Sequence, residues 1–168
     1  GLGVVAFGVG GDETALPAGD FAPLLAAAAR EGFGTTLHAG ETGGAASVRD
    51  AVLAGAQRIG HATAAGGAPE VLAMMAGAGV FAELCPGSNV ALGLYPDRAA
   101  HPLHRLIDAG VRVTLNSDDP PFFHTTLGTE YDLAGLDEQQ LRGIARTTIE
   151  ASFADEATKR QLLERISP

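Results

Sequence analysis

The chain has 168 residues, of which 46% are hydrophobic and 18% charged, and 20 acidic residues against 11 Lys and Arg give a formal net charge of -9. This composition is typical of one soluble domain, and the acidic balance excludes binding to nucleic acid or to an anionic membrane surface. No apolar stretch approaches the roughly 18 residues of a membrane span. The single cysteine, Cys85, excludes a disulfide framework and a metal site built from several thiolates, so we expect a cytoplasmic protein.

Short β-branched or apolar runs that end in polar residues or glycine predict five strands. In chain order they are Val4–Phe7, Thr35–His38, Arg58–His61, Val80–Cys85 and Arg112–Asn116. The chain begins at Gly1 and reaches the first apolar run at once, which suggests that an earlier part is missing.

Helical patterns fill the intervals between the strands and the C-terminal stretch. The predicted helices are Pro23–Arg30, Val48–Ala54, Pro69–Ala78, His101–Ala109, Asp137–Ser152 and Asp155–Ile166. Asp20 is expected to cap the first of them and Ser47 the second, and the last two each open on an aspartate suited to a helix N-terminus.

The alternation of strand and helix, with strand ends 23 to 31 residues apart, predicts an α/β fold built from parallel βαβ units. A closed eight-stranded barrel needs about 250 residues, and 200 at the least. The chain therefore forms either an open doubly wound sheet or the back half of a barrel, and we expect one domain over residues 1–168.

Polar residues gather at the predicted strand ends, where α/β folds place their sites. They occur in His-Ala-Gly-Glu (38–41), in His61, in Cys-Pro-Gly-Ser-Asn (85–89) and in Asn-Ser-Asp-Asp-Pro (116–120). A single histidine at a strand end is more often structural, and Asp-Asp-Pro alone is more often a turn. Together these motifs place two imidazoles and three carboxylates on one rim of the sheet, which favours a functional site.

Two histidines and three carboxylates suit Zn²⁺, held by nitrogen and oxygen ligands with one position open for water. Such a site is hydrolytic, because the bound metal lowers the pKa of its water towards about 7. Glu41 lies three residues from His38 and suits general acid/base work beside the metal.

Two other site types do not match. Gly-Val-Gly-Gly (8–11) after a strand has the start of a dinucleotide-binding loop, but Glu13 takes the place of the final glycine and Asp12 adds a second negative charge. The zinc deaminases with a Pro-Cys-x-x-Cys segment are excluded by the single cysteine.

The four motifs, in this order and at these intervals, resemble the adenosine deaminase family of metal-dependent hydrolases. Gly-Val-Gly-Gly-Asp-Glu (8–13) is similar to the glycine-containing loop after that family's fourth strand, and the resemblance runs from about residue 4 to the C-terminus. The family folds as an eight-stranded (β/α) barrel. The resemblance therefore implies a partial barrel with strands four to eight and their helices, whose exposed sheet needs a missing N-terminal half or self-association as cover.

The resemblance also implies a role for each matching residue. His38 and Asp118 would be zinc ligands, Glu41 would protonate the purine ring, and His61 would orient the attacking water. Asp119 would hydrogen-bond the water and the purine. The backbone of Gly11 would contact the far side of the ring, and Ser88 and Asn89 would hold the shape of a loop at the pocket.

Three departures from the family pattern stand out. The family's His-x-His pair is absent, and the one close pair, His101 and His104, is expected at the surface of a helix. Gly8 stands where many relatives have aspartate, and Ala62 follows His61 where glycine is usual.

These observations predict hydrolytic deamination of adenosine or deoxyadenosine to the inosine product and ammonia, as the C-terminal part of such an enzyme, with the isolated fragment inactive. The substrate would be a small purine nucleoside. Adenine and aminofutalosine deaminases, which share the His-Ala-Gly-Glu and Asp-Asp-Pro elements, are the alternative within the enzyme class. The alternative of another class is a truncated scaffold domain without catalysis.

Overall fold

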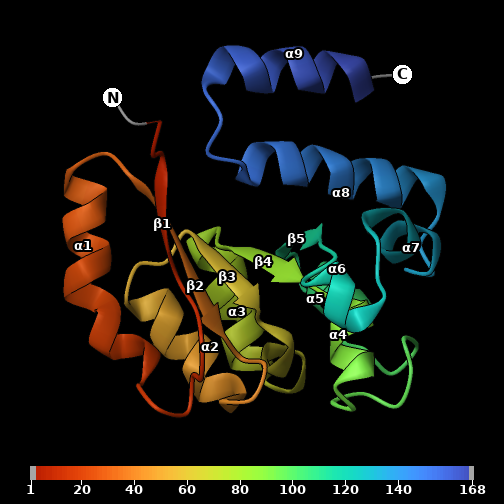
Figure 1. Ribbon diagram of the computed structural model, residues 1–168, viewed down its shortest axis with the longest axis horizontal. Coiled ribbons are helices and arrows are strands. Elements are labelled where there is room, and N and C mark those ends of the chain that lie inside the picture. The colour runs from red at the N-terminus through yellow and green to blue at the C-terminus, as the bar shows by residue number, and fades with distance from the viewer. Residues whose placement is uncertain (1–2, 167–168) are drawn as a thin grey trace.

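The computed structural model describes residues 3–166 (Figure 1). Its strands are β1 (Ala6–Val9), β2 (Gly34–Ala39), β3 (Arg58–His61), β4 (Phe81–Leu84) and β5 (Arg112–Leu115). Its α-helices are α1 (Ala22–Arg30), α2 (Gly44–Leu53), α3 (Pro69–Ala78), α4 (Pro86–Ala91), α5 (Leu103–Asp108), α6 (Pro120–Phe123), α7 (Leu127–Asp132), α8 (Glu138–Ala151) and α9 (Glu156–Ile166). Two 3₁₀ helices, η1 (Ala18–Phe21) and η2 (Thr63–Gly67), precede α1 and α3.

The five strands form one parallel sheet in the order β1-β2-β3-β4-β5, so every strand pairs with its neighbour in sequence. A doubly wound sheet reverses its strand order at a switch point, whereas a (β/α) barrel adds each strand beside the previous one. The order observed is that of a barrel segment. The prediction of an α/β partial barrel is confirmed, and the doubly wound alternative is wrong.

One face of the sheet packs against the helices. Leu37, Ile59, Ala82 and Val113 occupy the same register position on four successive strands and are all buried. The helices contribute buried partners to the same core, among them Leu25, Val48, Met75, Leu106 and Ile144. Because side chains alternate along a strand, this apolar row leaves the next register positions to the opposite face.

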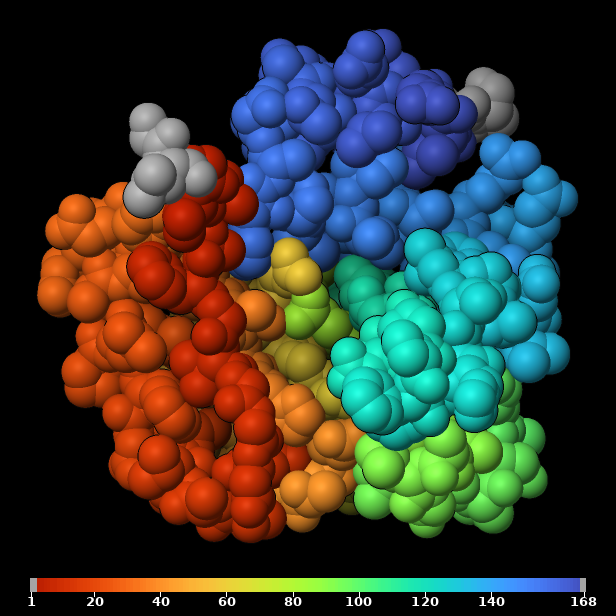
Figure 2. Space-filling view, viewed as in Figure 1, coloured from red at the N-terminus to blue at the C-terminus, as the bar shows by residue number. Residues whose placement is uncertain are grey.

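The opposite face is polar and half-buried. Glu83 accepts a hydrogen bond from the Thr36 hydroxyl at 2.7 Å and another from Arg58 Nε at 2.7 Å, which joins three neighbouring strands. The Arg112 guanidinium lies 3.9 Å from the centre of the Phe81 ring. Figure 2 shows the molecule hollowed between the N-terminal segment and the segment around residues 120–130. No helix within residues 3–166 has both the length and the apolar character needed to cross a bilayer.

Several boundaries differ from the sequence-based expectations. Arg58–His61 and Pro69–Ala78 form as predicted, while the first strand lies two residues later than predicted. Asp137, expected at the N-terminus of this helix, caps α8 by accepting a hydrogen bond from the Gln140 N–H at 2.8 Å. The short helices α4, α6 and α7 were not predicted, because four to six residues give too little periodicity to detect.

The two predicted caps at the start of the chain are wrong. Asp20 lies inside η1, and α1 follows directly from that 3₁₀ turn without a side-chain cap. Ser47 lies inside the first turn of α2, and its hydroxyl donates to the Glu13 carboxylate at 2.6 Å. A long-range acceptor has replaced the local capping bond at Ser47.

The Glu13 carboxylate holds the turn that follows β2. It accepts hydrogen bonds from the backbone N–H groups of Gly40 at 2.6 Å, Glu41 at 2.7 Å and Thr42 at 2.5 Å. The turn requires glycine at Gly40, which has φ +81°, and a Cβ there would collide with Val48 of α2. One buried anion from the loop after β1 thus fixes the backbone that carries Glu41.

The environment of Glu13 favours its charged form. Burial by itself raises the pKa, but the hydrogen bonds from Ser47 and from backbone N–H groups, including those of Thr42 and Gly40, outweigh it and lower the pKa to about 2. The ordinary value is 4.5. The carboxylate therefore stabilises the fold fully above pH 4.5, and that stabilisation is lost as the pH falls through about 2.

Glu13→Gln is expected to destabilise the chain by about 1.5–3 kcal/mol at pH 7, because hydrogen bonds to a charged acceptor become bonds to a neutral amide. The difference from the wild type should shrink as the pH falls below 4.5, where the wild-type carboxylate begins to gain its proton in the unfolded state. Urea unfolding followed by circular dichroism measures both effects. Glu164→Gln, on the exposed side of α9, is the control; a Glu13→Gln effect no larger than the control, or one independent of pH, would contradict this role.

The free edge of β1 is expected to drive self-association of the 168-residue chain, because Val4, Val5 and Phe7 are exposed beside unpaired backbone groups. Val5→Lys should shift the chain to smaller species in size-exclusion chromatography by placing a charge at this edge. Leu53→Lys, at an exposed apolar position on α2, should not. A monodisperse wild-type monomer with one sharp thermal transition would show instead that the open sheet is self-sufficient.

Candidate active site

The parallel sheet brings the predicted site residues to one end of the molecule. His38 is the penultimate residue of β2, His61 is the last residue of β3, and Glu41 and Asp118 follow the ends of β2 and β5. Because all five strands run the same way, their carboxyl ends share one rim. His38, His61 and Asp118 line an open cavity of about 420 Å³, together with Gly60, Glu83, Cys85, Asn116, Ser117 and Leu127.

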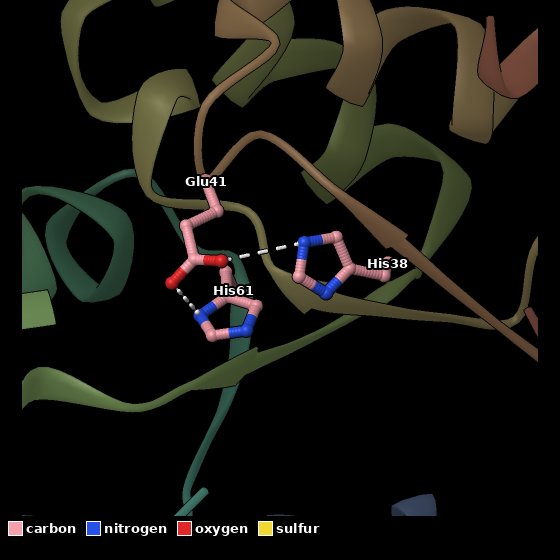
Figure 3. Close-up of side chains that lie close together, drawn as sticks. All are labelled: His38, Glu41 and His61. Carbon is pink, nitrogen blue, oxygen red and sulfur yellow. Dashed lines mark ion pairs between the residues drawn. The ribbon is translucent and has the colours of Figure 1, made fainter. Parts of the chain in front are cut away.

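Glu41 lies between the two histidines (Figure 3). One carboxylate oxygen is 3.4 Å from His38 Nε2, and the other is 3.2 Å from His61 Nδ1. The two imidazole rings are 4.6 Å apart, centre to centre, and meet edge to face. The three side chains place their ligand atoms within 4.8 Å of one another.

Asp118 joins the group from the far edge of the sheet. Its Oδ2 lies 3.9 Å from His61 Nε2, so His61 stands between Glu41 and Asp118. The backbone is strained here, since His61, Ala62 and Asp118 have φ values of +62°, +57° and +56°. Non-glycine residues in this region cost energy and cluster at functional sites.

Two other predicted residues lie outside this cluster. Asp119 is exposed at the start of α6, and the contacts described for residues 3–166 do not connect its side chain to His38, Glu41 or His61. Gly11 is exposed, with φ +123°, and lines a neighbouring cavity of about 230 Å³ that His38 also borders. The roles of Asp119 and Gly11 toward a substrate stay predictions.

Burial and charge shift the acidity of the central pair. Burial raises the pKa of Glu41, with the His38 charge opposing and the charges of Asp118 and Glu13 adding to the rise. Burial lowers the pKa of His61, and the neighbouring His38 lowers it further. The arrangement therefore favours a carboxyl group that can hold and release a proton, beside a neutral imidazole.

Three residues at the site were missed or misassigned from the sequence. Glu13 belongs to the glycine loop, and its contacts lie 27 to 34 residues away, so no local pattern reveals the role described above. Cys85 lies with His61 and Asp118 in a second group of close ligand atoms, but burial raises the pKa of its thiol, which favours the protonated form. His101, expected at the surface, is 3% exposed, whereas His104 is exposed as predicted.

His101 is buried because its side chain packs against the loop after β4. It precedes α5, and its Nε2 lies 3.2 Å from Asn89 Oδ1. Asn89 in turn donates to Glu41 at 2.9 Å, so it contacts the site as well as shaping the loop. Ser88 donates to the Cys85 carbonyl at 3.1 Å, a contact within the loop.

The donor set fits a zinc ion in part. His38 and Asp118 offer the nitrogen and oxygen ligands that zinc accepts and both line the cavity, but they fall in two separate groups of close ligand atoms that share only His61. Catalytic zinc sites have three or more protein ligands. His38 and Asp118 alone fall short of that number.

Gly8 and Ala62, the two residues that differ from the family pattern, lie in different surroundings. A Cβ at Gly8 would lie 3.3 Å from the Thr36 methyl group, which is a tight contact. Ala62 is fully buried in the left-handed conformation that glycine adopts without cost.

Comparison with known proteins agrees with this architecture. Residues 2–168 match the family described as adenosine deaminase. Adenine deaminase of Rhizobium leguminosarum bv. trifolii is 46% identical over 168 residues, covering 97% of this chain and 52% of the relative. Adenine deaminase of Chelativorans sp. is 47% identical over 170 residues, covering 98% and 52%. The chain thus spans about half the length of the curated relatives it matches.

Solved structures show the same fold. The adenine deaminase of Arthrobacter aurescens superposes with a TM-score of 0.89 at 28% identity, covering 96% of this chain and 51% of that one. A Burkholderia ambifaria amidohydrolase with bound Zn gives 0.88 at 26% identity, covering 99% and 48%. The N6-mAMP deaminase of Arabidopsis gives 0.87 at 27% identity, covering 98% and 50%. On the family match over nearly all its length, the chain belongs to the adenosine deaminase family.

Proposed function

We propose that this chain is the C-terminal half of a zinc-dependent deaminase that hydrolyses the amino group of a 6-aminopurine, with adenine as the substrate. The observation that carries the proposal is the Glu41 carboxylate, placed between two imidazoles at the strand ends. The relatives at 46 to 47% identity are named adenine deaminase, which favours adenine over the adenosine expected from the sequence motifs.

Metal binding and proton transfer are assigned to different residues. His38 and Asp118 would hold the zinc ion, which when bound lowers the pKa of a water molecule towards about 7. Glu41, with its raised pKa, would give a proton to the ring nitrogen beside the amino-bearing carbon and so make that carbon electrophilic. Water then adds to the carbon, the carbon–nitrogen bond breaks, and ammonia leaves.

His61 would orient the attacking water. Its neutral imidazole can donate or accept one hydrogen bond at the face that points to Asp118, where the cavity is open. Asp119 would hydrogen-bond the water and the purine, and the Gly11 backbone would contact the far side of the ring.

Adenosine remains a second candidate because the sequence Ser-Asp-Asp-Pro-Pro-Phe-Phe-His (117–124), followed by Glu130 and Tyr131, resembles adenosine deaminases. In the structure Glu130 is fully buried and pairs with Arg98 at 2.7 Å. Glu130 also accepts from the Gly87 N–H at 3.0 Å, so it ties the loop after β4 to α7. Ser117 and Asp118, at the start of this stretch, line the cavity at the site.

The complete polypeptide that carries this chain is expected to deaminate adenine when loaded with zinc, with kcat/KM exceeding that for adenosine by on the order of 10-fold or more. The 168-residue chain alone should stay far below ordinary turnover of about 1–1000 per second, since His38 and Asp118 alone leave zinc short of the three or more protein ligands usual in catalytic sites. Loss of the substrate absorbance measures both. A preference for adenosine would support the second candidate, and no turnover of any 6-aminopurine would show a scaffold without catalysis.

Two substitutions in the complete polypeptide should separate proton transfer from metal binding. Glu41→Gln is expected to lower kcat roughly 100- to 10,000-fold while zinc stays bound, because it removes an exchangeable proton and not a ligand. His38→Ala should lose the metal, and Glu164→Gln should change neither property. Zinc content by atomic absorption, measured beside kcat, tests this; equal zinc loss in the Glu41 and His38 variants would contradict the assignment.

A further inference from the structure

A line of polar contacts runs from the start of α5 to the centre of the site. The Leu103 backbone N–H donates to His101 Nδ1 at 3.2 Å, and His101 Nε2 lies 3.2 Å from Asn89 Oδ1. Asn89 Nδ2 then donates to Glu41 Oε1 at 2.9 Å. Leu103 is the first residue of α5, so its N–H has no partner within the helix, and the imidazole satisfies it.

The chemistry of these groups fixes the direction of the whole line. A backbone N–H can only donate, so His101 Nδ1 must accept, and a neutral imidazole then carries its hydrogen on Nε2. That hydrogen points at Asn89 Oδ1, which leaves the Asn89 amide nitrogen facing Glu41. The reversed amide would set two oxygens against each other at Glu41 and two donors against each other at His101.

The surroundings keep His101 neutral and in place. His101 is 3% exposed, and Asn89 is fully buried. Burial lowers the pKa of His101 to about 4, and the nearby Arg98 charge contributes to the shift. The Tyr95 ring packs edge-on against the imidazole with centres 5.1 Å apart, so the ring has little room to turn.

The same amide nitrogen reaches His61. Asn89 Nδ2 lies 3.3 Å from His61 Nδ1, and a primary amide has two hydrogens to donate. Glu41 Oε1 also lies 3.2 Å from His61 Nδ1, so the Asn89 amide nitrogen and the imidazole meet at the same carboxylate oxygen. The orientation of this one amide thus sets whether a donor or an acceptor faces the carboxylate.

We propose that His101 is a positioning residue that acts through Asn89 and fixes the orientation of the Glu41 carboxylate. The proposal rests on the proposed function, because that function makes Glu41 the proton donor. His101 itself touches neither substrate nor metal. Its contribution is the Nε2 hydrogen that holds the Asn89 amide in one of its two orientations.

Three variants of the complete polypeptide test the positioning role of His101. His101→Leu removes the donor and is expected to lower kcat by up to about 100-fold with little change in KM or zinc content, since a misplaced catalytic group costs rate. His101→Gln keeps an amide N–H at the reach of Nε2 and should recover most of kcat. His104→Leu changes the exposed histidine three residues further on, in α5, and should match the wild type.

Nitrogen-15 spectra of the histidine rings provide a readout that does not depend on turnover. His101 is expected in the Nε2–H form in the wild type, with Nδ1 accepting from the Leu103 N–H. Three outcomes would overturn the role proposed for His101. They are an Nδ1–H tautomer at His101, full kcat in His101→Leu, and a kcat in His101→Gln as low as that in His101→Leu. An inactive wild type would overturn the proposed function instead. The tautomer of the His101 ring would then be the test of its contact with Asn89.

Discussion

Parallel pairing of neighbouring strands is the constraint on which the rest of the structure depends. Side chains alternate along each strand, so the register that aligns Leu37 with Ile59 and Ala82 directs an apolar row to the helices. The same register brings the carboxyl ends of the strands together at one edge of the sheet. A one-residue slip would turn the core outward and move His38 away from His61, so one packing requirement fixes both the fold and the rim.

Polar contacts between loops fix the orientation of the side chains that the sheet brings close together. The Glu13 carboxylate orders the turn that carries Glu41, and Asn89 reaches the same side chain from the loop after β4. Both contacts are partly buried and charge-assisted, conditions under which hydrogen bonds hold geometry well. The Glu41 side chain is therefore held in place from the loops after β1 and β4 as well as by its own turn.

Much of this arrangement could be predicted because it depends on local pattern. The strand at Arg58–His61 and the helix at Pro69–Ala78 follow from short apolar periods and their flanking residues, and strand ends locate the site in any parallel sheet. The burial of His101 and the function of Glu13 could not be predicted, since both depend on partners 12 or more residues away. Asp119 shows the opposite case, because adjacency to Asp118 in sequence did not place its side chain beside the histidines.

We propose that strand ends from this chain supply part of a zinc site. Anomalous diffraction at the zinc edge, from crystals of the complete polypeptide grown with zinc, tests this proposal. One strong peak is expected at the rim of the sheet, about 2.0–2.2 Å from a nitrogen of His38 and an oxygen of Asp118. A peak bonded to neither residue, or no peak at the ends of β2 and β5, would contradict it.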